Sequence, residues 1–170
     1  MSSSDPNDVV EAVEEAEDAF EERGGGVPDH EEKIESGGDW ETQLTKACRL
    51  IEVAGVLREQ NGYYTAVIEL CFAAIERSIE AYSVAMAGDE VEDFQDHEYS
   101  YERAHQIGLF GRKTAESMKD LYSENRTESY YGGSRPTDRQ ADSMYELARR
   151  IHSFSVDQIR EGGVCICEGK

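Results

Sequence analysis

The residues best suited to chemistry lie in the stretch LYSENRTESYYGG, which places one arginine ahead of two adjacent tyrosines and two glycines. Arg126 and Tyr130 are four residues apart and share one face of a predicted helix, with Tyr131 one step round it. An arginine can hold a phosphate through two parallel hydrogen bonds, and a phenol can donate a hydrogen bond or stack on a base. Arg126, Glu128, Tyr130 and Tyr131 are therefore our candidate binding residues. The alternative is structural: Arg126 faces the last carbonyls of its helix and one tyrosine joins the core.

Common sequence signatures of catalysis and of cofactor binding do not occur in the chain. We find no phosphate-cradling glycine loop, no nucleophile elbow and no H-x-x-x-H or E-x-x-H pair on a predicted bundle face, and we expect neither a metal nor a cofactor. Among the four histidines, His97 is a catalytic candidate if folding brings it to Arg126; otherwise it caps a helix or lies in a connector. His152 is expected to be structural. The four histidines are His30, His97, His105 and His152.

Helices must position these residues, because apolar side chains recur every three or four residues and no alternating strand pattern occurs. We predict an all-α fold, an antiparallel bundle of four main helices plus a short connecting helix. Asp39 is the expected N-cap of the first main helix, Gly88 ends the second, and Thr137 to Gln140 form a capping box before the last. The predicted bundle helices are about 40–60, 63–87, 100–109, 112–131 and 137–162, and residues 89–99 form an acidic connector.

The chain is expected to divide into three parts. Residues 1–38 form an acidic flexible tail with a short helix at 5–22, residues 39–163 form the bundle, and residues 164–170 form a C-terminal tail. Cys48 and Cys71 lie on apolar helix faces and should be buried. Cys165 and Cys167 form a single C-x-C, which is only half of a typical metal site.

The composition is strongly acidic, with 37 acidic and 17 basic residues and a net charge of −20. The first 99 residues carry this charge, whereas acids and bases balance from residue 100 onward. A basic partner would explain the excess, but we favour adaptation to a salty cytoplasm, an acidic composition of the haloarchaeal type, and expect low salt to unfold the protein. No apolar run is long enough to span a membrane and no signal-peptide pattern opens the chain, so we expect a cytoplasmic protein.

Four segments in order resemble the HEPN family. They are an Ala- and Glu-rich helix (AVIELCFAAIERSIEAYSVAMAG), a His-containing connector (FQDHEYSYERAHQIGLFG), a helix ending in R-x4-aromatic (LYSENRTESYYG) and a capped last helix (PTDRQADSMYELARRIHSF). The resemblance covers about residues 40–160. It implies a dimeric helical bundle linked to nucleotide or RNA chemistry. Some members are metal-independent ribonucleases, and others are non-catalytic partners of nucleotidyltransferases.

The catalytic signature of that family is R-x4-6-H, and here Tyr131 or Tyr130 stands where the histidine would be. An unperturbed phenol has a pKa of about 10, so Tyr131 is a poor substitute for an imidazole base. Three functions follow. The first is a homodimeric binding module for RNA or a nucleotide, paired with a nucleotidyltransferase in a toxin–antitoxin, stress or defence role. The second is a ribonuclease using Arg126 and a nonlocal histidine such as His97. The third is a structural adaptor.

Overall fold

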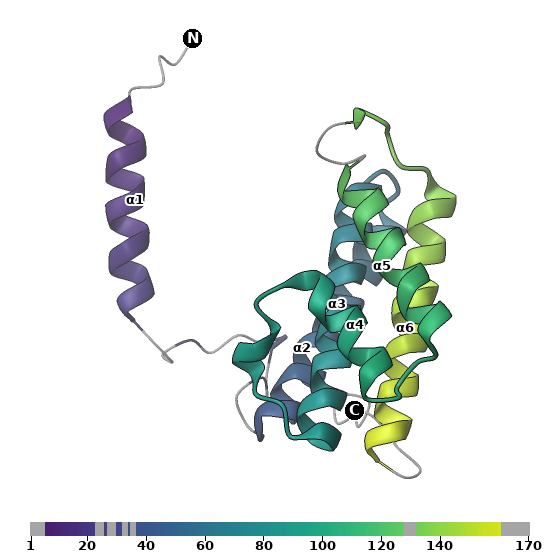
Figure 1. The fold of residues 1–170 in the computed structure, drawn as a ribbon. Helices are drawn as coiled ribbons and strands as arrows, with labels where there is room; N and C mark the ends of the chain where they lie inside the picture. The colour runs from purple at the N-terminus through teal and green to yellow at the C-terminus, as the bar shows by residue number, and fades with distance from the viewer. Residues whose placement is uncertain are drawn as a thin grey trace. The chain divides into compact units, whose positions relative to one another are not determined.

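The computed structural model describes residues 6–22, 26, 30–31, 34, 37–127 and 132–160. These residues form six α-helices and one short 3₁₀ helix, η1, with no strand among them (Figure 1). The all-α prediction is confirmed. The helix count exceeds four main helices plus one by the short helix expected at 5–22 and by η1, which was not predicted. The helices are α1 (Pro6–Glu21), α2 (Asp39–Glu59), α3 (Tyr64–Ala87), η1 (Val91–Phe94), α4 (His97–Gln106), α5 (Arg112–Thr127) and α6 (Asp138–Ile159).

The chain divides into two compact units, Met1–Glu32 and Lys33–Lys170. In the first unit α1 lies within the helix expected at 5–22, none of its residues is buried, and Val9, Val13 and Phe20 are all exposed. The second unit is the helical bundle. The sequence placed the boundary after residue 38, six residues later. The predicted C-terminal tail, including Cys165 and Cys167, lies outside the described residues.

Helix α3 is the centre of the bundle, since twelve of its 24 residues are buried. It packs against α2 and α6, and more lightly against α4. Asn61 and Gly62 make the turn between α2 and α3 with φ values of 51° and 101°, which places both residues in the left-handed region that suits asparagine and glycine. Cys48 and Cys71 are buried, as predicted.

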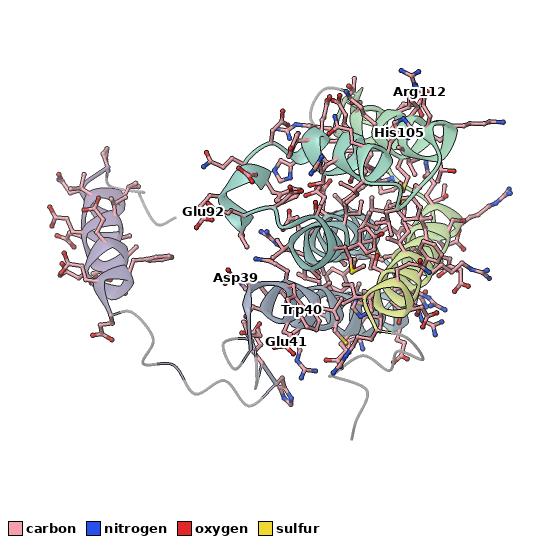
Figure 2. The ribbon with its side chains drawn as sticks, turned by 60° about the horizontal axis from the view of Figure 1, so that its bottom comes forward. Asp39, Trp40, Glu41, Glu92, His105 and Arg112 are labelled. Atoms are coloured by element: carbon pink, nitrogen blue, oxygen red, sulfur yellow. The ribbon has the colours of Figure 1, made fainter. Side chains whose placement is uncertain are left out.

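Local capping explains where the helices begin and end. Thr137 and Gln140 form the predicted capping box of α6, and Gly88 ends α3 in the left-handed conformation. The prediction that Asp39 caps α2 is wrong: Gly38 is the N-cap, and its N–H donates to Glu41 Oε2 at 3.0 Å. Because the Glu41 carboxylate reaches back to satisfy this donor, the cap needs no side chain of its own. Figure 2 labels Asp39, Trp40 and Glu41 at this end of α2.

The predicted acidic connector, residues 89–99, is partly helical. It contains η1, and α4 begins at His97 rather than near residue 100. Asp96 is the N-cap of α4, and its carboxylate accepts a hydrogen bond from the Glu98 N–H at 3.0 Å. Because α4 starts here, His97 lies in the first turn of the helix, and its side chain contacts Glu76 of α3. Among the helices that the structure describes, none is long and apolar enough to cross a membrane.

Asp89 ties the end of α3 to α4. Its carboxylate accepts two hydrogen bonds from Arg103, from Nε at 2.7 Å and from Nη2 at 2.8 Å, and a third from the Ser83 hydroxyl. The bonds from Arg103 hold the pKa of Asp89 below its ordinary value. A depressed pKa means that the folded state prefers the charged carboxylate. Its contribution to stability is therefore present above the ordinary aspartate range and lost as the pH falls through the folded-state pKa.

Replacing Asp89 by asparagine is expected to lower the free energy of unfolding at neutral pH by about 1–3 kcal/mol, the range for hydrogen bonds to a charged group. The difference from the wild type should shrink as the pH falls below about 4, because protonation then removes the same charge. Chemical denaturation across this pH range measures the effect. Glu92→Gln, at an exposed position of η1 (Figure 2), removes one charge nearby and should change little. An equal loss in both variants would contradict the role of the Arg103 pair.

Candidate functional site: the Tyr122 cluster

Five polar side chains meet where α3, α4 and α5 come together, and we call them the Tyr122 cluster. The cluster consists of Glu76 from α3, His97 and Tyr101 from α4, and Tyr122 and Arg126 from α5. Polar contacts between α4 and α5 hold two of these helices together beside it: Glu98 accepts a hydrogen bond from the Ser123 hydroxyl at 3.2 Å and pairs with Lys119 at 3.3 Å.

Glu76 is the buried carboxylate of the cluster, with a residue exposure of 6%. Its Oε2 lies 2.7 Å from Nδ1 of His97, and its Oε1 accepts a hydrogen bond from the Tyr101 hydroxyl at 3.2 Å. Burial raises the pKa of Glu76, and the hydrogen bond from His97 acts against this rise. Two donors on the two oxygens are what a charged carboxylate needs when water is excluded.

His97 is the accessible member of the pair, because its side chain is 60% exposed while that of Glu76 is 8% exposed. When the Glu76 carboxylate is ionised it only accepts hydrogen bonds, and the shared proton then lies on Nδ1 of His97. In the neutral imidazole this leaves the lone pair on Nε2. The Glu76 carboxylate thus selects the tautomer and orients a ring that solvent and a ligand can reach.

Tyr122 joins His97 to Arg126. Its ring lies 5.8 Å from the His97 ring, centroid to centroid, and its hydroxyl oxygen accepts a hydrogen bond from Nη1 of Arg126 at 2.8 Å. Burial raises the pKa of Tyr122, so the phenol keeps its proton at neutral pH. Because its oxygen accepts from Arg126 and no described residue accepts from it, the O–H remains able to donate to a ligand. Arg126 itself is exposed.

A second buried carboxylate lies near the cluster on the same helix. Glu80 is one turn after Glu76, with 3% of its surface exposed, and pairs with Arg77 at 2.7 Å. Burial raises the pKa of Glu80 as well, while Arg77 opposes the rise. Glu76 and Glu80 are thus two buried acids on one face of α3, each with a basic side chain as its partner. Within the described ranges, no three His, Cys, Asp or Glu side chains lie close enough to hold a metal ion.

The structure brings together two of the residues chosen from the sequence, since Arg126 and His97 both contact Tyr122. Glu128, Tyr130 and Tyr131 lie outside the described residues. Two other histidines lie elsewhere: His105 is exposed on α4, and His152 is buried on α6, where its Nδ1 lies 3.1 Å from the Ser78 hydroxyl. The structural role expected for His152 agrees with this burial.

Sequence reasoning did not identify Glu76, Tyr101 or Tyr122 as members of a polar site. One signal for Glu76 was present: it lies four residues after Phe72 and three before Ile79, on the apolar stripe of α3. A carboxylate on a buried helix face requires hydrogen-bond donors, so it marks a polar site within the core. Tyr101 carried no comparable signal, because a tyrosine on an apolar face is also an ordinary core residue.

Comparison with known proteins identifies the family of this helical chain. A family model described as Domain of unknown function (DUF8154) matches residues 4–167, and the chain belongs to that family. The match extends over α1 and the whole bundle. No curated protein and no solved structure matches the chain. None of these comparisons links the chain to the HEPN family.

Proposed function

We propose that this protein is an HEPN-like ribonuclease that cleaves single-stranded RNA without a metal ion, using the Tyr122 cluster. The observation that supports the proposal is the Glu76–His97 pair, which presents an oriented, exposed imidazole beside Tyr122 and Arg126. A carboxylate-oriented imidazole is a common general base, and an arginine with a phenol suits a phosphodiester. The sequence departure at Tyr131 is then less important, because His97 supplies the imidazole.

The reaction needs a base for the 2′-hydroxyl and charge stabilisation at the phosphate. Nε2 of His97 accepts the proton of the 2′-hydroxyl, and the 2′-oxygen forms a bond to phosphorus. The bond from phosphorus to the 5′-oxygen breaks, and the 5′-oxygen leaves with a proton from solvent, to which the imidazolium returns its own. Arg126 and the Tyr122 hydroxyl donate to the phosphate oxygens as negative charge develops on them. The products are a 2′,3′-cyclic phosphate and a 5′-hydroxyl end.

The test is incubation of the full chain with single-stranded RNA in the presence of a chelator. Cleavage that persists with the chelator and leaves 2′,3′-cyclic phosphate ends is the expected result. Salt should be varied, because the net charge of −20 repels RNA at low ionic strength. Intact RNA at every salt concentration, with the chain folded by circular dichroism, would contradict the proposal.

A second function rests on a specific observation. Among the described residues His97 is the one imidazole of the Tyr122 cluster, and efficient cleavage usually combines an acid with a base. The same cluster would then bind RNA or a nucleotide without cutting it, which is the binding module predicted from the sequence. RNA that binds but stays intact favours this function. The homodimer and the nucleotidyltransferase partner stay predictions, because the structure holds one chain.

A further inference from the structure

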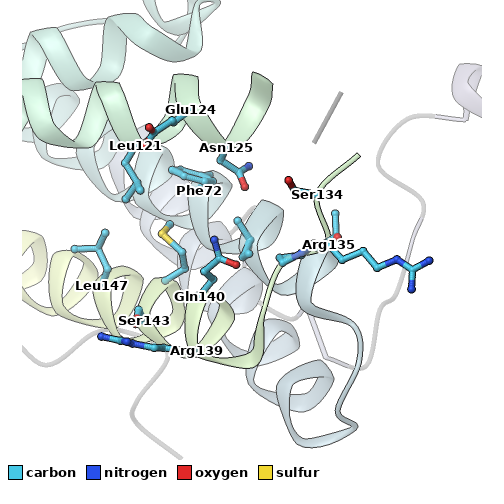
Figure 3. Close-up of a pocket in the computed structure, with 14 residues that line it drawn as sticks. Phe72, Leu121, Glu124, Asn125, Ser134, Arg135, Arg139, Gln140, Ser143 and Leu147 are labelled. Atoms are coloured by element: carbon cyan, nitrogen blue, oxygen red, sulfur yellow. The ribbon is translucent and has the colours of Figure 1, made fainter. Parts of the chain in front are cut away.

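A pocket of about 780 Å³ opens beside the Tyr122 cluster, bordered by α3, α5, the loop at 134–136 and α6 (Figure 3). This volume falls within the range of typical ligand pockets, about 300–1,000 Å³. Its floor is apolar. The floor residues are Ile68, Phe72, Leu121, Met144 and Leu147.

The pocket and the Tyr122 cluster share a wall. Phe72 lines the pocket and also packs its ring edge-on against Tyr122, with centroids 5.4 Å apart. On α5, Leu121 and Asn125 line the pocket while the residues directly after them, Tyr122 and Arg126, belong to the cluster. A ligand that is long enough can therefore occupy both at once.

Two amide side chains face each other across the pocket with complementary atoms (Figure 3). Oε1 of Gln140 accepts from the Thr137 N–H at 2.8 Å, and its Nε2 has no acceptor among the described residues. Nδ2 of Asn125 donates to Glu69 at 3.1 Å, and its Oδ1 has no donor within the same ranges. The pocket thus offers one donor and one acceptor above an apolar floor. A nucleobase has this combination, a flat apolar face with donors and acceptors on its edge.

Two arginines border the opening of the pocket, Arg135 and Arg139. Arginines elsewhere in the described part of the bundle pair with carboxylates, as Arg58 and Arg103 do, but no carboxylate of the described residues pairs with Arg135 or Arg139. In Figure 3, Arg135 extends outward from the loop and Arg139 lies along α6. In a chain with 37 acids, two arginines left beside one pocket indicate an anionic ligand.

We infer that this pocket binds one nucleotide unit, with its base on the apolar floor and its phosphate at the opening that Arg135 and Arg139 border. The unit is either a free mononucleotide or one nucleotide of an RNA strand whose next phosphate lies at the Tyr122 cluster. The inference rests on the proposed function for the choice of a nucleotide as the ligand. Glu124 also lines the pocket, and its carboxylate suits a ribose hydroxyl or an exocyclic amino group as donor.

The first experiment measures binding of adenosine 5′-monophosphate to the full chain by calorimetry, with ribose 5-phosphate and inorganic phosphate as probes that lack the base. We expect the nucleotide to bind at least tenfold more tightly than ribose 5-phosphate. Ser143→Trp places a large side chain in the pocket from an exposed position of α6 and should abolish nucleotide binding while helicity is kept. Equal affinities for the nucleotide and ribose 5-phosphate, or unchanged binding by this variant, would overturn the inference.

The second experiment tests the arginines. The double variant Arg135→Gln/Arg139→Gln should lose about tenfold or more in affinity, the scale of charge-assisted hydrogen bonds to a phosphate. Arg149→Gln/Arg150→Gln removes the same charge further along α6, where Glu146 pairs with both arginines, and is the matched control. Equal losses in the two double variants would reduce the effect to net charge and overturn the assignment of the phosphate.

A short single-stranded oligoribonucleotide distinguishes the two sources of the nucleotide. If the pocket serves an RNA strand, the oligoribonucleotide should bind more tightly than the mononucleotide and lose affinity in Ser143→Trp. Binding by neither probe overturns the inference. If the protein binds the nucleotide at the pocket but does not cleave RNA, the inference stands and the proposed ribonuclease function fails. If the protein binds no nucleotide at the pocket and Ser143→Trp still cleaves RNA at the wild-type rate, the inference about the pocket fails and the proposed ribonuclease function stands.

Discussion

Replacing His97 by alanine is expected to lower the rate of RNA cleavage by about 10²–10⁴-fold, the usual contribution of general acid–base catalysis. The imidazole is the accessible group that can take the 2′-hydroxyl proton, and alanine leaves Glu76 too deeply buried to replace it. Cleavage is measured under single-turnover conditions at saturating protein, so that binding does not limit the rate.

The matched control is His105→Ala, which removes an exposed histidine from the same helix; Figure 2 labels this residue. It should cleave RNA at the rate of the wild type. RNA affinity should change little in His97→Ala, because the base acts on the reaction rather than on binding. Cleavage by His97→Ala within a factor of a few of the wild-type rate would show that another group is the base.

Replacing Arg126 by alanine should weaken RNA binding by about 1–3 kcal/mol, the scale of a charge-assisted hydrogen bond. The guanidinium is exposed at the end of α5 and donates to the Tyr122 hydroxyl, so its loss removes a positive charge and the group that orients the phenol. Fluorescence anisotropy with labelled RNA measures the affinity. The His97→Ala background keeps the RNA intact during the titration.

Arg112→Ala, at the other end of α5, is the control for general charge, because that side chain is 77% exposed and pairs with Glu116. It should lose far less affinity than Arg126→Ala. Arg126→Lys should recover only part of the loss, since lysine keeps the charge but not the planar fork of donors. If Arg126→Ala unfolds the chain, the residue is a structural support and the binding role fails. An equal loss in Arg112→Ala would reduce the effect to net charge.

Together, the two largest effects separate the functions that the sequence left open. A ribonuclease should lose its rate in His97→Ala and its affinity in Arg126→Ala. A binding module should show the second effect alone, because it has no reaction to lose. A structural adaptor should show neither. The pocket beside the cluster adds a measurement that needs no cleavage at all.

The sequence by itself determined the helical class, most helix ends and two buried cysteines. These features are local: the capping box of Thr137 and Gln140 spans four residues, and Gly88 ends α3 through its own backbone conformation. Prediction from local sequence failed where two neighbouring residues could each serve as the N-cap of a helix. Asp39 is a good N-cap residue, yet the chain starts α2 one residue earlier because Glu41 can cap Gly38. The sequence also picked out Arg126 by its type and its place at a helix end.

Only the tertiary structure showed that Arg126 and His97 contact the same residue, Tyr122. Glu76 and His97 are 21 residues apart on different helices, and Tyr122 meets both His97 and Arg126 only because α4 and α5 pack beside α3. Side-chain periodicity reports which face of a helix is buried, but not which neighbour covers it. For the same reason the pocket could not be predicted from the sequence, because its lining comes from three helices and a loop. A carboxylate such as Glu76 becomes a site when packing removes its water and leaves His97 and Tyr101 as its donors.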